Sequence, residues 1–477
     1  MKISENIKEN LEHIRREIKS DDIATLDIKI GDKDATLVFA KDIVDKNAIG
    51  ELILRPASYY NGQVTKEKLD SLFLSPEKRE LNLWQDILDS VVTGEAILFV
   101  DGINTVYAFG LRKFEKRAIA EPPTFTVIKG PREGFVESLP VNISLMRRKL
   151  KSPKLTFVNL EAGIYSKTPV SLVYIEGIAE PELIETLKKK IQSINIDAVL
   201  DSSYITKSLG EHKKSLFKQI GNTEKPDILA SKILEGRVGI LVDGSPIALT
   251  VPYLLIEDFQ SPSDYYSSSY SATVARSLRI ISVVISLLLP SFFVAAELFH
   301  LQLIPLSFLL TIVNSIKGIP LTPSYEMFFT LLIFEILNEA SVRMPKYVGM
   351  VVSIVGGLVL GETAVTAGII SAPTLMIVAF SGICLYTVPE LEQTFSVIRI
   401  IYLIIAGALG AYGLLIFSGL LLVYVLTFEN YSTPLCAPFS PLVKQDLKDS
   451  FYKGFFVEKS ATPKSIQPDK NTKKGED

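Results

Sequence analysis

Cysteine, histidine and tryptophan are scarce in this sequence of 477 residues, which contains two, three and one of them. Cys384 and Cys436 lie in apolar surroundings and are too few for a disulfide framework or a zinc site. The three histidines, His13, His212 and His300, are scattered along the chain. We therefore expect no metal centre, and the sequence indicates no cofactor.

Patterns typical of enzymes and nucleic-acid-binding proteins are missing as well. The chain shows no nucleophile paired with a base, no paired catalytic carboxylates, and neither the phosphate-loop nor the dinucleotide-binding glycine pattern. Its formal net charge of -3 provides no basic footprint for nucleic acid, and aromatic residues are not interleaved with basic ones. We expect neither an enzyme nor a partner of nucleic acid.

Charge is depleted from one long part of the chain. The 155 residues from Arg276 to Asn430 hold only six Lys or Arg and eight Glu, whereas the flanking regions carry nearly all the remaining charge. This distribution predicts a soluble half followed by a membrane half. The first 22 residues are charged throughout and lack both an apolar core and a small-residue cleavage site, so they do not resemble a secretory signal peptide. We expect the N-terminal region to be cytoplasmic.

Two Asp-Gly pairs between apolar runs, Asp101-Gly102 and Asp243-Gly244, are typical of β-hairpins with a type I′ turn. The patterns around them, which begin at Gly94 and Gly236, match without a gap at a constant offset of 142 residues. A duplicated subdomain and a chance match of two common hairpins explain this similarity about equally well. A turn alone accounts for both aspartates.

The fold class that these patterns predict is an α+β cytoplasmic region of two subdomains, followed by an α-helical polytopic membrane domain. Helices are expected at residues 3–19, 83–92, 181–194 and 228–235, and strands at 26–30, 35–39 and 172–178. The expected boundaries are 1–125 and 126–260 for two α/β subdomains, 261–275 for a linker, 276–430 for the membrane domain and 431–477 for a partly disordered tail.

A glycine-bounded turn lies between the two hairpins and leads into a basic helix. The turn contains Gly130 and Arg132, and the helix ends near Arg147 and Arg148. A turn of this kind could hold an anion at the helix N-terminus. The favoured alternative is a structural turn and a solvated basic face that join the two subdomains.

Four apolar segments are long enough to span a bilayer, at residues 280–296, 349–370, 372–389 and 401–428. The last contains Gly407, Gly410 and Gly413, which permit close helix contact. Segments near residues 301 and 325 are uncertain, so we expect about four to six membrane segments. The side of the membrane on which the C-terminus lies stays open.

One apolar segment carries a polar face made of Glu335, Asn338 and Glu339. Glu335 and Glu339 are four residues apart and share a helix face, with Asn338 close by. This face could line water, contact a partner helix or lie at the membrane interface.

Six motifs occur in order along the chain: GPREGFVESLPVNISLMRRKL, GRVGILVDGSPIALTVP, FQSPSDYY, FEILNEASVRMP, SIVGGLVLGETAVTAGIISAP and PLCAPFSPL. Together they resemble the A subunit of GerA-type spore germinant receptors over roughly residues 85–442. The resemblance implies a protein of the spore inner membrane that works with a transporter-like B subunit, which binds the nutrient, and a lipoprotein C subunit. It also implies self-association, as a pentamer, into a channel that releases monovalent cations when nutrient binds.

The pore of such a channel is expected within residues 349–370. A carboxylate in an apolar span costs about 2.5 to 3.5 kcal/mol, so Glu362 is expected to face protein or water. Several copies of Glu362 would form an acidic ring that favours cations, and Leu360 could gate by dewetting. A helix-packing role for the glycine-rich face carries equal weight. The pore-lining candidates are Ser353, Gly356, Gly357, Leu360, Glu362 and Thr363.

Two other functions stay open at this point. A membrane scaffold or signalling subunit of the receptor would need no conduction path of its own. A secondary-transporter-like protein would normally show two related membrane halves, and the sequence shows no repeat in its membrane region.

Overall fold

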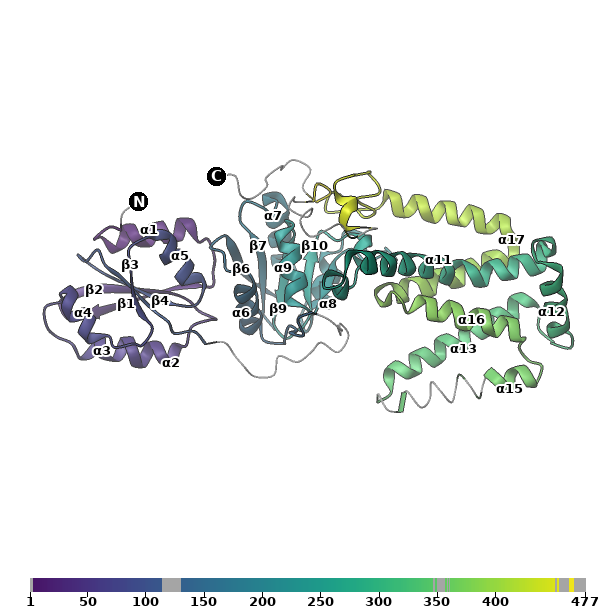
Figure 1. Ribbon diagram of the computed structural model, residues 1–477, viewed down its shortest axis with the longest axis horizontal. Coiled ribbons are helices and arrows are strands. Elements are labelled where there is room, and N and C mark those ends of the chain that lie inside the picture. The colour runs from purple at the N-terminus through teal and green to yellow at the C-terminus, as the bar shows by residue number, and fades with distance from the viewer. Residues whose placement is uncertain are drawn as a thin grey trace. The chain divides into compact units, whose positions relative to one another are not determined.

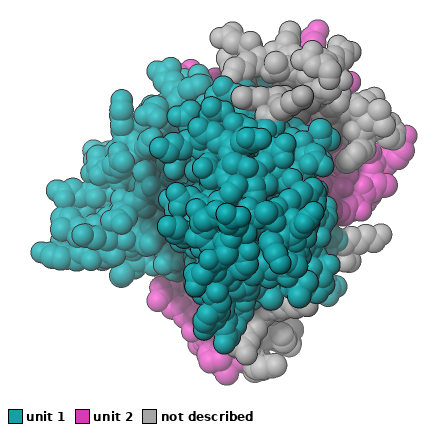
Figure 2. Space-filling view, turned by 90° about the vertical axis from the view of Figure 1, so that its left-hand side faces the viewer, with its two compact units in different colours: residues 1–253, 430–433, 460–477 teal, residues 254–429, 434–459 magenta. Residues whose placement is uncertain are grey.

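The computed structural model describes residues 3–113, 130–345 and 361–450, together with 348–349, 357, 359, 453 and 463–466. The chain forms two compact units, which Figure 2 colours teal and magenta. Unit 1 comprises Met1–Tyr253, Asn430–Thr433 and Ser460–Asp477, and unit 2 comprises Leu254–Glu429 and Pro434–Lys459. Unit 1 is an α+β region with two sheets and unit 2 is helical, which confirms the fold class predicted for the two halves of the chain.

The first subdomain, residues 3–113, is a five-stranded antiparallel sheet between two layers of helices (Figure 1). Its strand order is β1-β2-β4-β5-β3. Val38 of β2 packs under the helices of one face, whereas Leu37 and Phe39 pack under those of the other. A strand buried on both faces places successive apolar side chains in opposite cores. The elements are β1 (Ile23–Ile30), β2 (Lys33–Ala40), β3 (Lys78–Leu81), β4 (Ala96–Val100) and β5 (Val106–Phe109), with α1 (Ile7–Glu17) and α5 (Trp84–Val92) on one face and α2 (Lys46–Ile49), α3 (Arg55–Tyr59) and α4 (Lys66–Leu72) on the other.

The second subdomain, residues 130–253, repeats this architecture. Its sheet has the order β6-β7-β9-β10-β8, which is the order of the first sheet when the strands are counted from its own first strand. The sequence similarity at an offset of 142 residues therefore has a structural counterpart. The elements are β6 (Leu155–Ala162), β7 (Thr168–Ile175), β8 (Gly221–Thr223), β9 (Val238–Val242) and β10 (Ala248–Val251), with α6 (Leu139–Lys149) and α9 (Pro226–Leu234) on one face and α7 (Pro181–Gln192) and α8 (Ser202–Leu209) on the other.

The two Asp-Gly pairs lie where predicted, in the connections from β4 to β5 and from β9 to β10. Each connection is longer than the two residues of a tight hairpin turn, and only the glycines have positive φ, 69° at Gly102 and 82° at Gly244. A type I′ turn needs positive φ at both central residues. The hairpins were therefore predicted correctly, but the turn type was wrong.

The described part of unit 2 is mainly helical. Two of its described helical segments, Ser269–Phe299 and Pro389–Thr427, are long and apolar enough to cross a membrane. Helix α12, with 11 residues, is only about 17 Å long and is too short to cross a hydrocarbon core of about 30 Å. The helices are α10 (Pro262–Tyr265), α11 (Ser269–Phe299), α12 (Leu306–Ile316), α13 (Pro323–Arg343), α15 (Gly361–Thr366), α16 (Ala372–Leu385) and α17 (Glu392–Thr427).

Helix α17 reverses direction at Gly410, where φ is 60° and ψ is -147°. The rings of Tyr402 and Phe417 lie 4.7 Å apart, although a continuous helix would separate residues 15 positions apart by about 22 Å. The single span predicted for residues 401–428 is therefore wrong, because residues 392–409 and 411–427 form two antiparallel helices. The close approach predicted for the glycines does occur, since a Cβ on Gly407 would lie 2.7 Å from the Ser324 hydroxyl oxygen.

Candidate functional site

The polar face of α13 points mainly at the first half of α17. Glu335 Oε1 accepts hydrogen bonds from Arg399 Nη2 at 2.5 Å and from the Ser396 hydroxyl at 3.0 Å. The Asn338 amide donates to Glu392 Oε1 at 2.5 Å. Of the three roles considered for this face, the structure shows contact with another helix for Glu335 and Asn338. Glu339 differs, because it is exposed and pairs with Arg343 of its own helix.

Arg399 is a buried cation in this cluster, with a relative exposure of 1%. Its guanidinium also lies 3.4 Å from the Ser381 hydroxyl, so the cluster connects α13, α16 and α17. A buried arginine is strongly unfavourable without a counter-charge, and Glu335 supplies one. The position of α13 relative to α17 is therefore fixed by charge as well as by apolar packing.

Glu326, near the other end of α13, is a second anchor, with a relative exposure of 1%. Its Oε1 accepts a 2.7 Å hydrogen bond from the backbone N–H of Ser371, whose hydroxyl caps the start of α16. Glu326 thus fixes the backbone at Ser371, directly after residues 349–370, which we call the candidate pore stretch. The sequence analysis assigned no role to Glu326, although a carboxylate in an apolar run was a signal.

The candidate pore stretch is described in part. Ser353, Gly356 and Leu360 lie outside the described residues. Glu362 and Thr363 belong to α15, and both are exposed. The Thr363 hydroxyl donates a hydrogen bond to the Val359 carbonyl at 2.6 Å, so this donor is used by the backbone four residues earlier in the chain. Among the described residues, none places a heavy atom within 4 Å of a Cβ built on Gly357. These three positions are therefore open surface on the single chain.

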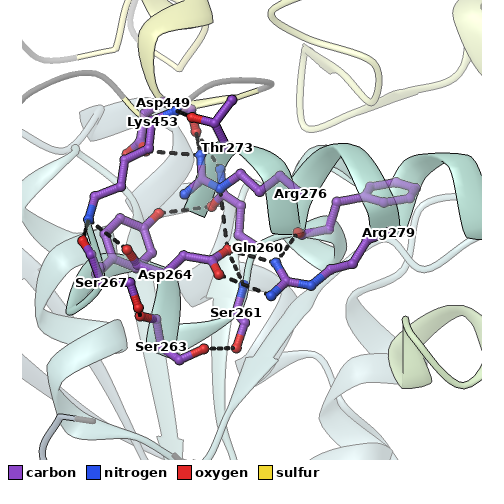
Figure 3. A network of polar contacts seen from close by, with 12 residues as sticks. Gln260, Ser261, Ser263, Asp264, Ser267, Thr273, Arg276, Arg279, Asp449 and Lys453 are labelled. Atoms are coloured by element: carbon purple, nitrogen blue, oxygen red, sulfur yellow. Dashed lines mark hydrogen bonds and ion pairs between the residues drawn. The ribbon is translucent and has the colours of Figure 1, made fainter. Parts of the chain in front are cut away.

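A polar network lies where the first long apolar helix begins (Figure 3). Asp264 is buried, and its two carboxylate oxygens accept hydrogen bonds from Arg279 at 2.7 and 3.0 Å. Arg276, which is fully buried, donates from Nε to the same carboxylate at 3.3 Å. One carboxylate therefore orients both arginines of the first turns of α11.

The same network binds the C-terminal segment. Arg276 Nη1 donates to the Asp449 carbonyl at 2.8 Å, and the Gln260 amide donates to that carbonyl at 2.6 Å. The Lys453 ammonium donates to the Asp264 and Ser267 carbonyls at 2.6 and 2.9 Å. Asp449 and Lys453 are therefore held at the start of α11. The sequence predicted a linker at residues 261–275 here, but it gave no sign of the tail.

Asp264 is held in its ionised form. Burial disfavours the charged carboxylate, but the hydrogen bonds from Arg279 and from the Ser261 N–H outweigh it, together with the charges of Arg279 and Arg276. The pKa of Asp264 is consequently below its ordinary value. The network thus contains a permanent anion between two cations at neutral pH.

The basic helix α6 connects the two subdomains of unit 1. Arg147 is fully buried and forms a bidentate ion pair with Asp22, at 2.8 Å from Nε and 2.7 Å from Nη2. Arg148 and Lys149 instead pair with Glu133 in the preceding turn. Arg147 therefore lies in the subdomain interface, with its charge matched by Asp22. The other turn residues named from the sequence are placed as follows: Gly130 has a φ of 124°, and Arg132 is exposed.

Comparison with known proteins gives matches over nearly the whole chain. The sequence model described as "Bacillus/Clostridium GerA spore germination protein" matches residues 4–465. Spore germination protein KA of Bacillus subtilis (strain 168) is 33% identical over 486 residues, which cover 100% of this chain and 89% of that protein. The uncharacterized membrane protein YfkQ of the same organism is 33% identical over 94% of this chain and 89% of its own length.

The solved structures that match include the N-terminal domain of the A subunit of the Bacillus megaterium spore germinant receptor GerK3. It is 30% identical to this chain, and the match covers 54% of this chain and 98% of that domain, with a TM-score of 0.42.

Proposed function

This chain belongs to the Bacillus/Clostridium GerA spore germination protein family, and from that premise we propose that it is the A subunit of a nutrient-gated germinant receptor. In this proposal it has no catalytic role and acts with a transporter-like B subunit, which binds the nutrient, and a lipoprotein C subunit. Self-association, as a pentamer, forms a channel for monovalent cations in the spore inner membrane. The match over residues 4–465 supports the proposal, because it includes both the α+β region and the helical unit.

A membrane location is supported by the composition and length of α11 and α17. Exposed apolar side chains cover both helices, among them Leu278, Ile281, Leu415 and Leu420. In water such a surface would be an aggregation liability, whereas lipid or neighbouring subunits would cover it favourably. The relative YfkQ is described as a membrane protein.

The junction network supports a specific topology. Arg276 at the start of α11 and Asp449 of the tail are hydrogen-bonded, so both lie at the same membrane surface if α11 spans the bilayer. The number of crossings between them is then even, and the two antiparallel arms of α17 supply two of them. With the N-terminal region in the cytoplasm, the tail is cytoplasmic as well.

The exposure of Glu362 is the observation that carries the channel proposal. A carboxylate in an apolar unit requires water or a counter-charge, and it is expensive to expose to lipid. A ring of subunits would bring the copies of Glu362 together around a shared water path, where they would attract cations. Gly357 and Thr363 would lie beside the same path.

Measurement of potassium efflux from nutrient-triggered spores tests this proposal. Glu362→Gln is expected to slow the efflux while the amount of receptor in the membrane stays normal. Glu339→Gln is the matched control, because Glu339 is an exposed carboxylate of the same unit that pairs with Arg343. Unchanged efflux in the Glu362→Gln spores would reject the acidic ring.

The scaffold alternative rests on a different observation. Glu335 and Asn338 are engaged by α17, so the polar face of α13 is used for helix packing rather than for lining water. A scaffold subunit would need no more than this. Purified receptor in lipid vesicles distinguishes the two functions, since a channel shows nutrient-dependent cation flux and a scaffold shows none.

A further inference from the structure

The turn that follows the last helix has an unusual backbone. After α17 ends at Thr427, a two-stranded sheet is formed by β11 (Glu429–Asn430) and β12 (Thr433–Pro434). Its two linking residues, Tyr431 and Ser432, have positive φ angles of 49° and 57°. Turns of this kind favour Asn-Gly, because residues with a Cβ are disfavoured in the left-handed region. A tyrosine persists here only if contacts elsewhere hold it, and such strain clusters at functional sites.

The contacts that hold the backbone N–H and the side chain of Tyr431 are made with the second subdomain. The Tyr431 N–H donates to Glu211 Oε2 at 2.8 Å, and its hydroxyl donates to the Leu209 carbonyl at 2.7 Å. The Lys190 ammonium lies 4.2 Å from the centre of the tyrosine ring, which is a cation–π contact. The turn is therefore fixed by one aromatic side chain rather than by its own backbone preference.

Two neighbouring interactions reinforce this anchor. Lys190 forms a 3.1 Å ion pair with Glu211, so the cation over the ring and the carboxylate at the backbone N–H are linked to each other. The Asn430 side chain is fully buried, and its amide donates to the Gln219 carbonyl. The pKa of Glu211 is lowered, because the Tyr431 N–H and Lys190 outweigh the opposing effect of burial. At neutral pH the Glu211 carboxylate is thus ionised.

The anchored residues interrupt the helical unit along the chain. Asn430–Thr433 belong to unit 1, whereas Glu429 on one side and Pro434 on the other belong to unit 2. The chain thus leaves the helical unit for four residues and returns to it. A movement of the second subdomain that carries these residues with it pulls covalently on the end of α17.

We propose that Tyr431 is a positioning residue that couples the second subdomain to the C-terminal end of α17, and so passes a conformational change between the soluble region and the membrane helices. This inference rests on the proposed receptor function. The anchor joins two segments of the same chain: the aromatic ring of Tyr431 contacts the Lys190 ammonium, and its hydroxyl donates to the Leu209 backbone carbonyl.

Two glycine variants separate the anchor from the strain. Tyr431→Gly relieves the positive φ but removes the ring, whereas Ser432→Gly relieves the positive φ and keeps the ring. The spores are challenged with a rich amino-acid and sugar broth. Tyr431→Gly and Tyr431→Ala are expected to lower the germination rate per receptor at least about tenfold, because each variant loses one hydrogen bond and one cation–π contact. Ser432→Gly is expected to stay within about twofold of the wild type.

A pair of lysines provides a second test that leaves the turn intact. Lys190 and Lys207 both line a cavity of about 630 Å³ beside Glu211. Lys190→Met is expected to slow germination, and the matched Lys207→Met is not. This pair decides the question if the tyrosine variants fail to accumulate in the membrane.

Receptor amount and protease cleavage within residues 429–434 are measured alongside germination, using the detergent-purified receptor. Coupling predicts faster cleavage and slow germination at a normal receptor amount. A purely structural role predicts a lower amount with a normal rate per receptor, and that result overturns the proposal. Absence of cation flux from wild-type receptor in vesicles would reject the channel instead, and would leave the effect of Tyr431 on germination to be judged independently.

Discussion

The Tyr402 hydroxyl donates a 3.0 Å hydrogen bond to the Ser418 hydroxyl, although the two residues are 16 positions apart in one continuous apolar run. In a straight helix they would be separated by about 24 Å. The bond therefore requires that α17 is a helical hairpin, with arms of about 27 and 26 Å that approach the thickness of a hydrocarbon core. The hairpin returns the chain to the end of unit 2 from which α11 starts, and this is what allows the tail to reach Arg276.

Gly410 is the residue on which the hairpin depends. Its φ of 60° with a ψ of -147° suits glycine alone, and a Cβ there would lie 2.9 Å from the ring of Phe299. Gly410→Ala is expected to destabilise the purified chain by about 2 to 4 kcal/mol, from backbone strain and overpacking together. Thermal unfolding in detergent measures the loss.

The control for this variant lies in the second arm. In the part of the chain that the structure describes, no atom lies within 4 Å of a Cβ built on Gly419, so Gly419→Ala is expected to be neutral or to stabilise the helix by up to about 1 kcal/mol. Equal unfolding temperatures for the two variants would contradict a reversal at Gly410.

The sequence could predict the soluble half better than the membrane half, for a physical reason. Apolar periodicity marks an amphipathic helix such as α1, and the Asp-Gly pairs mark their hairpins. In the part of α17 that follows Arg399, apolar side chains lie on every face, so no pattern distinguishes one long helix from two antiparallel ones. Strand β8 was missed because its three residues, Gly221–Thr223, carry no alternation of apolar and polar side chains.

The candidate site was predictable only where its members are close in sequence. Glu335 and Asn338 could be placed on one helix face from their spacing. Their partners Arg399 and Glu392 lie on α17, more than 50 residues away, and only the packing of α13 against it brings them together. The bond between Arg276 and Asp449 joins residues 173 positions apart and has no local signal at all.

The ion pair between Arg147 and Asp22 is expected to dominate the stability of the contact between the two subdomains. Removal of one partner leaves an uncompensated buried charge, which costs about 3 to 5 kcal/mol. Arg147→Met and Asp22→Asn should each show this loss in denaturant unfolding of the full chain, and the double variant should lose less than the sum. Additive losses would mean that the two side chains act independently.

An exposed ion pair across the same subdomains serves as the control. Lys19 and Glu176 approach to 3.0 Å, but their side chains are 60% and 43% exposed. Lys19→Met is therefore expected to change stability by less than about 1 kcal/mol. A loss as large as that of Arg147→Met would show that burial does not decide the strength of the contact.

The junction network is expected to weaken in acid. Because the pKa of Asp264 is lowered in the folded chain, its contribution to stability is fully present above its ordinary pKa of about 3.9 and is lost as the pH falls through the lower folded value. The difference in unfolding temperature between wild type and Asp264→Asn should stay constant from pH 7 to about pH 5 and shrink below about pH 4. A difference that shrinks already between pH 7 and 5 would assign the effect to another group.

Because Glu335 and Arg399 neutralise each other, we expect replacement of Glu335 alone to lower the yield of folded receptor and replacement of both residues to restore much of it. Glu335→Gln leaves Arg399 buried without its counter-charge, so the amount of folded receptor recovered in detergent should fall sharply, in line with a cost of about 3 to 5 kcal/mol. Glu335→Gln combined with Arg399→Gln removes both charges and should restore much of the yield, because two amides can still hydrogen-bond across α13 and α17. Glu339→Gln affects an exposed pair and should cost about 0.5 kcal/mol or less. If the double variant were recovered no better than the single one, the guanidinium would be needed for something other than neutralising Glu335, and the Ser381 hydroxyl, 3.4 Å from the guanidinium, would be the next group to test.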